Sequence, residues 1–226
     1  IIYEQEQEKK EMHADLVIDA SGAAFALRYE FTSSLGEKVW EDDIFSAYKT
    51  MRKLTSEDAL KKYSNGELIH SPKGYRWISQ LDEDILDVGC CIVSDVKDVM
   101  AAKKEAEYMI SKMEGVKEES FGGGGHVIPM TLPIASLVCN SFACVGENAI
   151  MTNPGNGCGI SGAVLGAEIL GNIILKNDDF SIAGLWEYGY EWFSGRGAMY
   201  ASNYFPSQFF EEEECKLLKA KNLITG

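Results

Sequence analysis

The residues best suited to chemistry lie between positions 142 and 175, where an apolar strand, a turn-rich loop and a helix follow one another. Glycines at 155, 157 and 159 remove side chains from the loop, so a ligand can approach its backbone closely. The loop leads into a predicted helix at 160–175, whose first N–H groups and dipole favour negative charge. The spacing therefore predicts a binding site for a ligand that carries negative charge.

Two further features belong to the same segment. Glu147, just past the strand, is placed to accept hydrogen bonds from ligand hydroxyls. The helix carries small residues that permit close packing against a sheet or a cofactor: Gly162, Ala163, Gly166, Ala167 and Gly171. Neither common nucleotide loop fits, because no lysine follows the glycines and no GxGxxG directly follows the strand. A tight turn that joins a strand to a packed helix, without a ligand, is the alternative that the segment alone leaves open.

Short apolar strands must position this loop. Leu16-Val17-Ile18 is a continuous apolar run, typical of a strand buried on both faces of a parallel sheet. Ser21-Gly22 marks a turn at its carboxyl end, which is the edge where ligands bind in open α/β sheets. We expect the partners of this strand to come from later in the chain or from sequence outside it.

Residues 29–133 have the pattern of a different layer. We expect these elements in chain order: helices at 42–52 and 56–63, strands at 74–79 and 85–93, and a helix at 95–113. Ser56 is a predicted N-cap, and the glycine run before His126 indicates a loop. A strand pair followed by a helix indicates an α+β segment. Beyond residue 178 the chain has the pattern of aromatic-rich helices.

Composition limits the kinds of partner. The 226 residues include 35 acidic and 21 basic side chains, a net charge of −14, which argues against a broad nucleic-acid surface. No apolar run is long enough to cross a bilayer and no secretory signal is visible, so we expect a cytoplasmic protein, with peripheral membrane contact left open. The six cysteines form no CxxC pair, which argues against a metal site; we expect them to be buried and reduced.

Four segments carry motifs: ADLVIDASGAAFALR at 14–28, GYRWIS at 74–79, GGGGHVIP at 122–129 and VGENAIMTNPGNGCGI at 145–160. In this order they resemble the archaeal geranylgeranyl reductase group of flavoproteins, which are built on the p-hydroxybenzoate hydroxylase plan. The first resembles the strand end where the chain leaves the FAD domain, and the second the YxWxFP element of the substrate cavity. The third resembles the glycine-rich segment before the return to the FAD domain, and the fourth the GDAAG…NPxxGGGI element.

The resemblance implies a fold class of α/β and α+β. The chain would be the C-terminal portion of an FAD/NAD(P)-binding three-layer fold, with an antiparallel-sheet substrate domain and a helical tail. The implied domains are the end of the FAD-binding domain at 1–28, the substrate domain at 29–133, the return to the FAD-binding domain at 134–177 and a helical region at 178–226. The family's N-terminal dinucleotide-binding segment has no counterpart in this sequence, so a missing N-terminal half is an expected partner.

The resemblance also assigns residues. FAD would be contacted by Ala20, Gly146, Glu147, Gly157, Gly159 and Ile160. Glu147 would hold the ribityl chain in place of the family's aspartate, and the helix start would stabilise negative charge on the reduced flavin. Tyr75 and Trp77 would line the substrate cavity, although Ser79 and Gln80 replace the phenylalanine and proline of YxWxFP.

The function implied is FAD-dependent reduction of isoprenoid double bonds in archaeal-type membrane lipids. The substrate would be an isoprenoid lipid, while the electron donor and the catalytic residues are not identified. Two alternatives stay open: an electron-transfer flavoprotein dehydrogenase, and a non-catalytic or truncated partner half that cannot bind FAD alone. The glutamate at 147, the altered YxWxFP element and the absent dinucleotide turn favour the second alternative.

Overall fold

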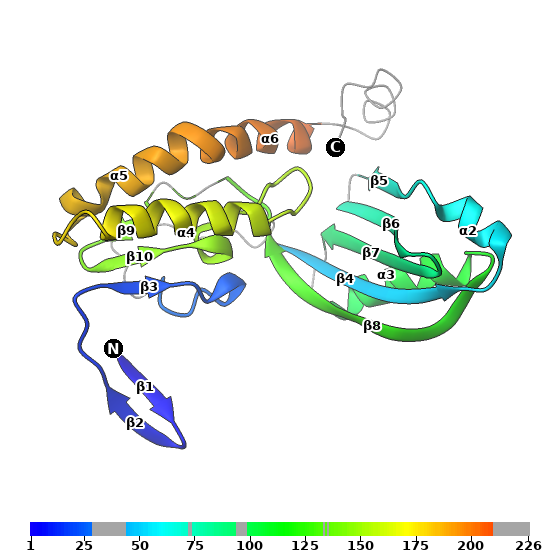
Figure 1. The fold of residues 1–226 in the computed structure, drawn as a ribbon, viewed down its shortest axis with the longest axis horizontal. Helices are drawn as coiled ribbons and strands as arrows, with labels where there is room; N and C mark the ends of the chain where they lie inside the picture. The colour runs from blue at the N-terminus through cyan, green and yellow to red at the C-terminus, as the bar shows by residue number, and fades with distance from the viewer. Residues whose placement is uncertain (29–43, 72–73, 94–98, 133, 135, 210–226) are drawn as a thin grey trace. The chain divides into compact units, whose positions relative to one another are not determined.

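The computed structural model describes residues 1–28, 44–71, 74–93, 99–132, 134 and 136–209 (Figure 1). The chain forms two compact units. Unit 1 comprises residues 1–38, 132–153 and 158–202, and unit 2 comprises residues 39–131, 154–157 and 203–226. Each unit is described by itself.

Unit 1 is built on a three-stranded sheet in the order β3-β10-β9. Its strands are β3 (Val17–Asp19), β9 (Val138–Cys139) and β10 (Phe142–Cys144). The central strand, β10, pairs in parallel with β3 and antiparallel with β9, and its three residues are fully buried. The predicted parallel pairing is confirmed. The prediction that β3 is buried on both faces is wrong at Ile18, which is 47% exposed because β3 lies at the edge of the sheet.

In unit 1 the sheet is followed by α4 (Ile160–Ile174) and α5 (Ile182–Trp192). A π-helical turn at Phe193–Gly197 joins α5 to α6 (Ala198–Phe209), whose residues from 203 onward belong to unit 2. Gly162 and Gly166 let α4 pack closely, since a Cβ on either would lie within 2.3 Å of Met151. Ser181 caps α5 by accepting a hydrogen bond from the Gly184 N–H. The N-terminal hairpin, β1 (Ile2–Gln5) and β2 (Glu8–Glu11), is exposed along almost its whole length.

The aromatic side chains of this region divide between core and surface. Leu185, Tyr188 and Trp192 are fully buried at helical spacing, and the Tyr188 hydroxyl donates to the Cys144 carbonyl oxygen at 2.9 Å. Burial raises the pKa of Tyr188 above its ordinary value. Part of the predicted aromatic-rich tail is therefore the core that holds α5 on the sheet. Among the described residues, no helix is both long enough and apolar enough to span a bilayer.

Unit 2 is a five-stranded antiparallel sheet in the order β5-β6-β7-β4-β8, with two helices. The elements are β4 (Ile44–Leu54), α2 (Glu57–Tyr63), β5 (Glu67–Ser71), β6 (Gly74–Asp82), β7 (Ile85–Val93), α3 (Val99–Ser111) and β8 (Val116–Pro129). Helix α3 packs against β4, β7 and β8 (Figure 1). The antiparallel pair β6–β7 and the helix predicted at 56–63 are confirmed, and Ser56 caps α2 through the Ala59 N–H. The helix predicted at 95–113 is confirmed as α3 at 99–111, and residues 95–98 lie outside the described residues.

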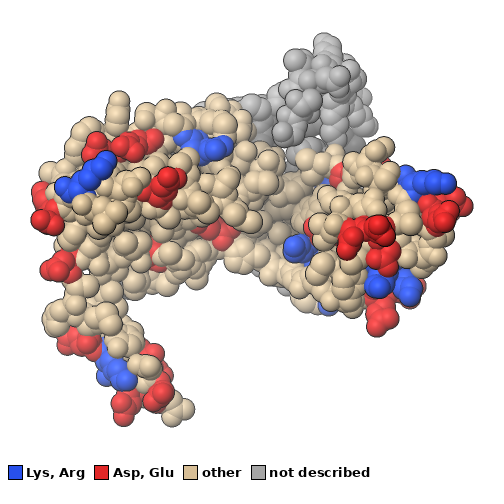
Figure 2. All heavy atoms as spheres, viewed as in Figure 1, with Lys and Arg blue, Asp and Glu red and all other residues tan. Residues whose placement is uncertain are grey.

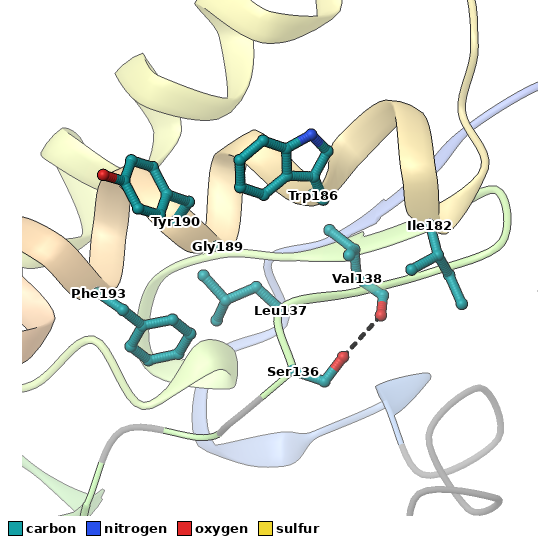
Figure 3. A pocket seen from close by; sticks show the side chains of 8 residues that line it. All are labelled: Ser136, Leu137, Val138, Ile182, Trp186, Gly189, Tyr190 and Phe193. Carbon is teal, nitrogen blue, oxygen red and sulfur yellow. Dashed lines mark hydrogen bonds between the residues drawn. The ribbon is translucent and has the colours of Figure 1, made fainter.

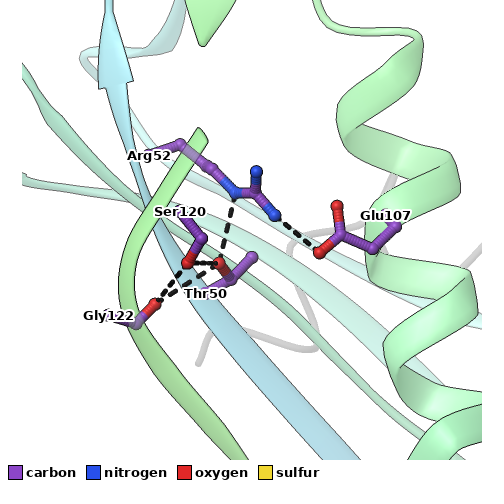
Figure 4. A network of polar contacts seen from close by, with 5 residues as sticks. All are labelled: Thr50, Arg52, Glu107, Ser120 and Gly122. Atoms are coloured by element: carbon purple, nitrogen blue, oxygen red, sulfur yellow. Dashed lines mark hydrogen bonds and ion pairs between the residues drawn. The ribbon is translucent and has the colours of Figure 1, made fainter. Parts of the chain in front are cut away.

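The helix predicted at 42–52 is wrong over residues 44–52, which belong to β4 between β7 and β8; residues 42 and 43 lie outside the described residues. Its polar residues Thr50 and Arg52 are buried under α3 (Figure 4). Because polar residues occupy buried positions, the sequence of β4 lacks the alternation of apolar and polar residues that indicates a strand. Arg52 donates to Thr50 Oγ1 at 3.2 Å and to Glu107 Oε1 at 2.6 Å. The glycine run before His126 is also not a loop: it pairs with β4 as part of β8.

Candidate functional site

The site begins where the two parallel strands of unit 1 end. After β10 the chain makes a single helical turn, Gly146–Ala149. Gly146 has a φ of +73°, and a Cβ there would lie 3.4 Å from the Ala163 Cβ of α4. A Cβ on Gly22, which follows β3 with a φ of +68°, would lie 3.5 Å from Glu147 Oε2. Glu147, half-buried, thus lies beside the turn after β3, and the structure brings together the two strand ends that the sequence singled out.

A buried polar network fixes these two turns. Asp19, 3% exposed, accepts hydrogen bonds from the N–H groups of Ser21 and Leu27 at 2.9 and 3.0 Å. Its Oδ2 also accepts from Asn148 Nδ2 at 3.1 Å, and Arg28 donates to the Asn148 carbonyl oxygen at 3.0 Å. Burial raises the pKa of Asp19, but the hydrogen bonds from Ser21 and from the backbone at 27 and 28 outweigh it, so the pKa lies below its ordinary value.

The network of Asp19, Arg28 and Asn148 was not predicted from the sequence. Asp19, Arg28 and Asn148 are all at most 3% exposed, which is unusual for such polar side chains and requires partners. The available signal was the aspartate at the end of an apolar strand together with the asparagine that follows Glu147. The network links segments that are 129 residues apart in the chain and holds the turn that carries Glu147.

The start of α4 has no side-chain cap. Its N-cap residue is Gly159, and the Asn153 N–H closes the preceding loop on the Cys158 carbonyl oxygen at 3.0 Å. A Cβ on Gly159 would lie 3.0 Å from Thr152 Oγ1. Within the described part of the chain, Thr152 Oγ1 and Asn148 Oδ1 are buried atoms without a hydrogen-bond partner. This uncapped helix end and the two buried polar atoms fit a ligand with negative charge and hydrogen-bonding groups.

The predicted cofactor residues divide between the two units. Ala20, Gly146, Glu147, Gly159 and Ile160 belong to unit 1, whereas Gly157 belongs to unit 2. Ala20 and the Ile160 side chain are exposed, and Gly157 has a φ of +71°. A Cβ on Gly157 would lie 2.3 Å from the Tyr75 hydroxyl. The structure therefore packs a predicted cofactor residue against a predicted substrate residue.

Tyr75 and Trp77 lie on the face of the sheet opposite α3. Their ring centroids are 5.8 Å apart, so the expectation that both aromatic side chains share one face is confirmed. Tyr75 packs with Ala47, Cys91 and Met130, while the Trp77 indole donates to Asp87 Oδ2 at 3.2 Å. Burial raises the pKa of Cys91 to about 12, which keeps its thiol protonated.

The cysteines differ in exposure. Cys90, Cys91 and Cys144 are fully buried, as expected, and Cys139 is partly exposed. Cys158 is exposed, so the expectation of burial is wrong there; it lies in the loop just before α4. Cys215 lies outside the described residues.

An apolar groove of unit 1 contains none of the predicted site residues (Figure 3). It has a volume of about 310 Å³ and is lined by Ser136, Leu137, Val138, Ile182, Trp186, Gly189, Tyr190 and Phe193. The rings of Trp186 and Tyr190 are 5.5 Å apart and about 60% exposed. On the face seen in Figure 2, most basic side chains stand beside acidic ones.

No family model matches the chain. Over 205 residues it is 23% identical to a digeranylgeranylglycerophospholipid reductase from Sulfolobus acidocaldarius, a match that covers 86% of this chain and 45% of that protein. A protein of the same name from Methanothrix thermoacetophila is 22% identical over 205 residues, which is 88% of this chain and 51% of that protein. The chain therefore spans about half the length of these curated relatives.

Solved structures share the fold. A geranylgeranyl bacteriochlorophyll reductase-like protein from Thermoplasma acidophilum matches with a TM-score of 0.73 at 15% identity, over 96% of this chain and 59% of that one. Klebsiella pneumoniae HpxO, solved with FAD and uric acid, matches with a TM-score of 0.60 at 16% identity, over 92% of this chain and 54% of that one. The fold class is confirmed as that of flavoproteins, and so is the resemblance to the geranylgeranyl reductase group.

Proposed function

We propose that this chain, which has the fold of the geranylgeranyl reductase-like flavoproteins, holds the ribityl and ring side of an FAD site in an oxidoreductase that reduces isoprenoid double bonds of membrane lipids. One observation carries the proposal: the turn with Glu147 lies against the turn after β3 and beside the uncapped start of α4. Ligands of open α/β sheets bind at such carboxyl ends of parallel strands.

The residues present fit the cofactor. Glu147 and the backbone of Ala20 and Gly146 would hold the ribityl chain, while the backbone of Gly157, Gly159 and Ile160 would face the ring. Gly22, Gly146 and Gly157 have positive φ angles, which glycine adopts without the strain that a side chain would cause. When bound, FAD would supply the hydride for the double bond. The chain's own part is to orient the ribityl hydroxyls and to place the N–H groups of α4 against negative charge.

The substrate side of the proposal rests on unit 2. Tyr75 and Trp77 form an apolar wall on one face of the sheet, suited to an isoprenoid chain. The two curated relatives are named as reductases of a digeranylgeranylglycerophospholipid, and that substrate class comes to this chain as part of the proposal.

A second candidate role is that of one half of a flavoprotein that needs a further polypeptide segment to bind FAD. Among the described residues no strand pairs with the outer edge of β3, and Ile18 on that strand is 47% exposed. Helix α4 has an exposed apolar stripe in which Ile160, Val164 and Leu175 are 85%, 64% and 86% exposed. A parallel strand followed by a helix would pair with this edge and cover this stripe.

Absorbance spectra of the purified chain with added FAD test the proposal. We expect flavin bands to stay with the protein after gel filtration. If they do so only when a polypeptide segment that pairs with β3 is supplied, the chain is one half of a flavoprotein. Gly159→Trp should abolish retention, because the indole would fill the start of α4. The control is Gly171→Trp on the same helix, where a Cβ meets no atom within 4 Å. Equal flavin retention in both variants would count against the assignment.

A further inference from the structure

The sheet face of unit 2 opposite α3 carries a row of residues that crosses all five strands. Leu68, Trp77, Gly89, Lys49 and Gly124 are directly opposite one another in register. Side chains that are directly opposite in an antiparallel sheet point to the same face. Lys49 therefore shares the face of Trp77, and between them lies only Gly89.

The Trp77 ring lies over the glycine of this row. A Cβ on Gly89 would lie 2.2 Å from Trp77 Cζ2, so the indole occupies the space above β7. Asp87, two residues earlier on β7, accepts the indole N–H at 3.2 Å and fixes the ring from the side. The result is a flat apolar surface that leads from Leu68, which is 43% exposed, toward β4.

Lys49 stands at the far end of this surface. It is exposed, and no ion pair among the described residues includes it, whereas Lys53 on the same strand is 3.6 Å from Asp84. Its neighbours Tyr48 and Thr50 point to the other face, toward α3. A Cβ on Gly124, directly opposite Lys49, would meet no atom within 4 Å, so this face of the sheet is open at Gly124. The acid closest in register on this face is Asp87, a diagonal neighbour whose Oδ2 accepts from Trp77.

We propose that this face binds an amphiphile with an isoprenoid chain and an anionic phosphate head group, with the chain on Trp77 and Leu68 and the phosphate at Lys49. This inference rests on the proposed function for its isoprenoid chain and adds the head-group site. The charge argument is local: Lys49 is exposed on the same face as the Trp77 indole, and no ion pair among the described residues neutralises it. A lysine ammonium next to an apolar surface attracts a phosphate as a point charge.

The test compares farnesyl monophosphate with farnesol, below their aggregation concentrations, by calorimetric titration of the full chain without FAD. We expect the phosphate form to bind more tightly, and Lys49→Met to weaken it about three- to fivefold, the range of an exposed ion pair. Farnesol binding should be unchanged in this variant. Trp77→Phe should weaken both ligands, because it removes the indole that Asp87 holds.

Lys104→Met is the matched control, since Lys104 is an exposed lysine on α3, which covers the opposite face. Equal losses in Lys49→Met and Lys104→Met, an unchanged preference for the phosphate in Lys49→Met, or no binding of either ligand by the unmodified chain would overturn the proposal. Because no step of this assay uses FAD, a failed flavin site leaves its result intact. An unchanged urea unfolding midpoint in Lys49→Met would show that a weaker phosphate affinity does not come from misfolding.

Discussion

Asp19→Asn tests whether the buried network organises the strand ends. In the native chain, Oδ1 accepts from the Ser21 N–H, and Oδ2 accepts from the Leu27 N–H and from Asn148 Nδ2. An asparagine has one acceptor oxygen. In the Oδ2 position this oxygen keeps the bonds from the Leu27 N–H and Asn148 Nδ2. Its NH₂ group then faces the Ser21 N–H, and because both groups are donors, that hydrogen bond is lost. The loss of one charge-assisted bond amounts to about 1.5–3 kcal/mol of unfolding free energy.

The measurement is equilibrium unfolding in urea at neutral pH, followed by tryptophan fluorescence. Asp179→Asn is the matched control, because Asp179 also accepts a backbone N–H, from Ser181 at 2.9 Å, but is exposed on the surface. Asp19→Asn should lower the urea midpoint clearly and Asp179→Asn should not. Equal midpoints for both variants and the unmodified chain would refute the idea that Asp19 fixes the turns after β3 and β10.

Three further predictions follow from the same structure. Ser56→Ala removes the cap of α2 and should lower the unfolding free energy by about 1 kcal/mol, measured by urea unfolding, with no such loss expected for the exposed Ser64→Ala. Gly157→Ala places a Cβ 2.3 Å from the Tyr75 hydroxyl at a φ of +71°, so it should cost about 1–3 kcal/mol in the same assay; an unchanged midpoint would contradict the packing. Because the pKa of folded Asp19 lies below the unfolded value of about 3.8, its contribution is present above that pH and is lost as pH falls through the folded pKa. Urea unfolding between pH 7 and pH 3 should therefore show a steeper loss for the unmodified chain than for Asp19→Asn, and parallel curves would contradict this.

Local patterns predicted the elements whose signals are contiguous in the sequence. The buried strand β10, the glycine loop and helix α4 lie within one segment, and the N-cap residue Ser56 is enough to predict the start of α2. Strand β4 was predicted to be a helix because the hydrogen-bond partners of its buried polar residues are distant in the sequence. Arg52 is bound by Glu107, 55 residues away, and Thr50 by Ser120, 70 residues away. Such partners leave no trace in a local periodicity.

The candidate site was predicted in part for the same reason. Glu147 and the glycines could be identified from one segment, and the structure brings Glu147 beside Gly22. The groups that hold them were missed, because Asp19 and Asn148 meet only after the strands pair in parallel. The exposure of Ile18 was also missed, because an apolar run does not reveal whether a strand has one neighbour or two.

Hydrogen exchange of the backbone amides, measured with and without saturating FAD, shows whether the ends of β3 and β10 and the start of α4 bind the cofactor. We predict slower exchange in three segments when FAD is present: 19–22 after β3, 146–149 after β10, and 157–162 at the start of α4. Helix α3 of unit 2 should exchange at the same rate in both conditions. Unchanged exchange in all three segments, or protection confined to other parts of the chain, would contradict the claim that these strand ends form the FAD site.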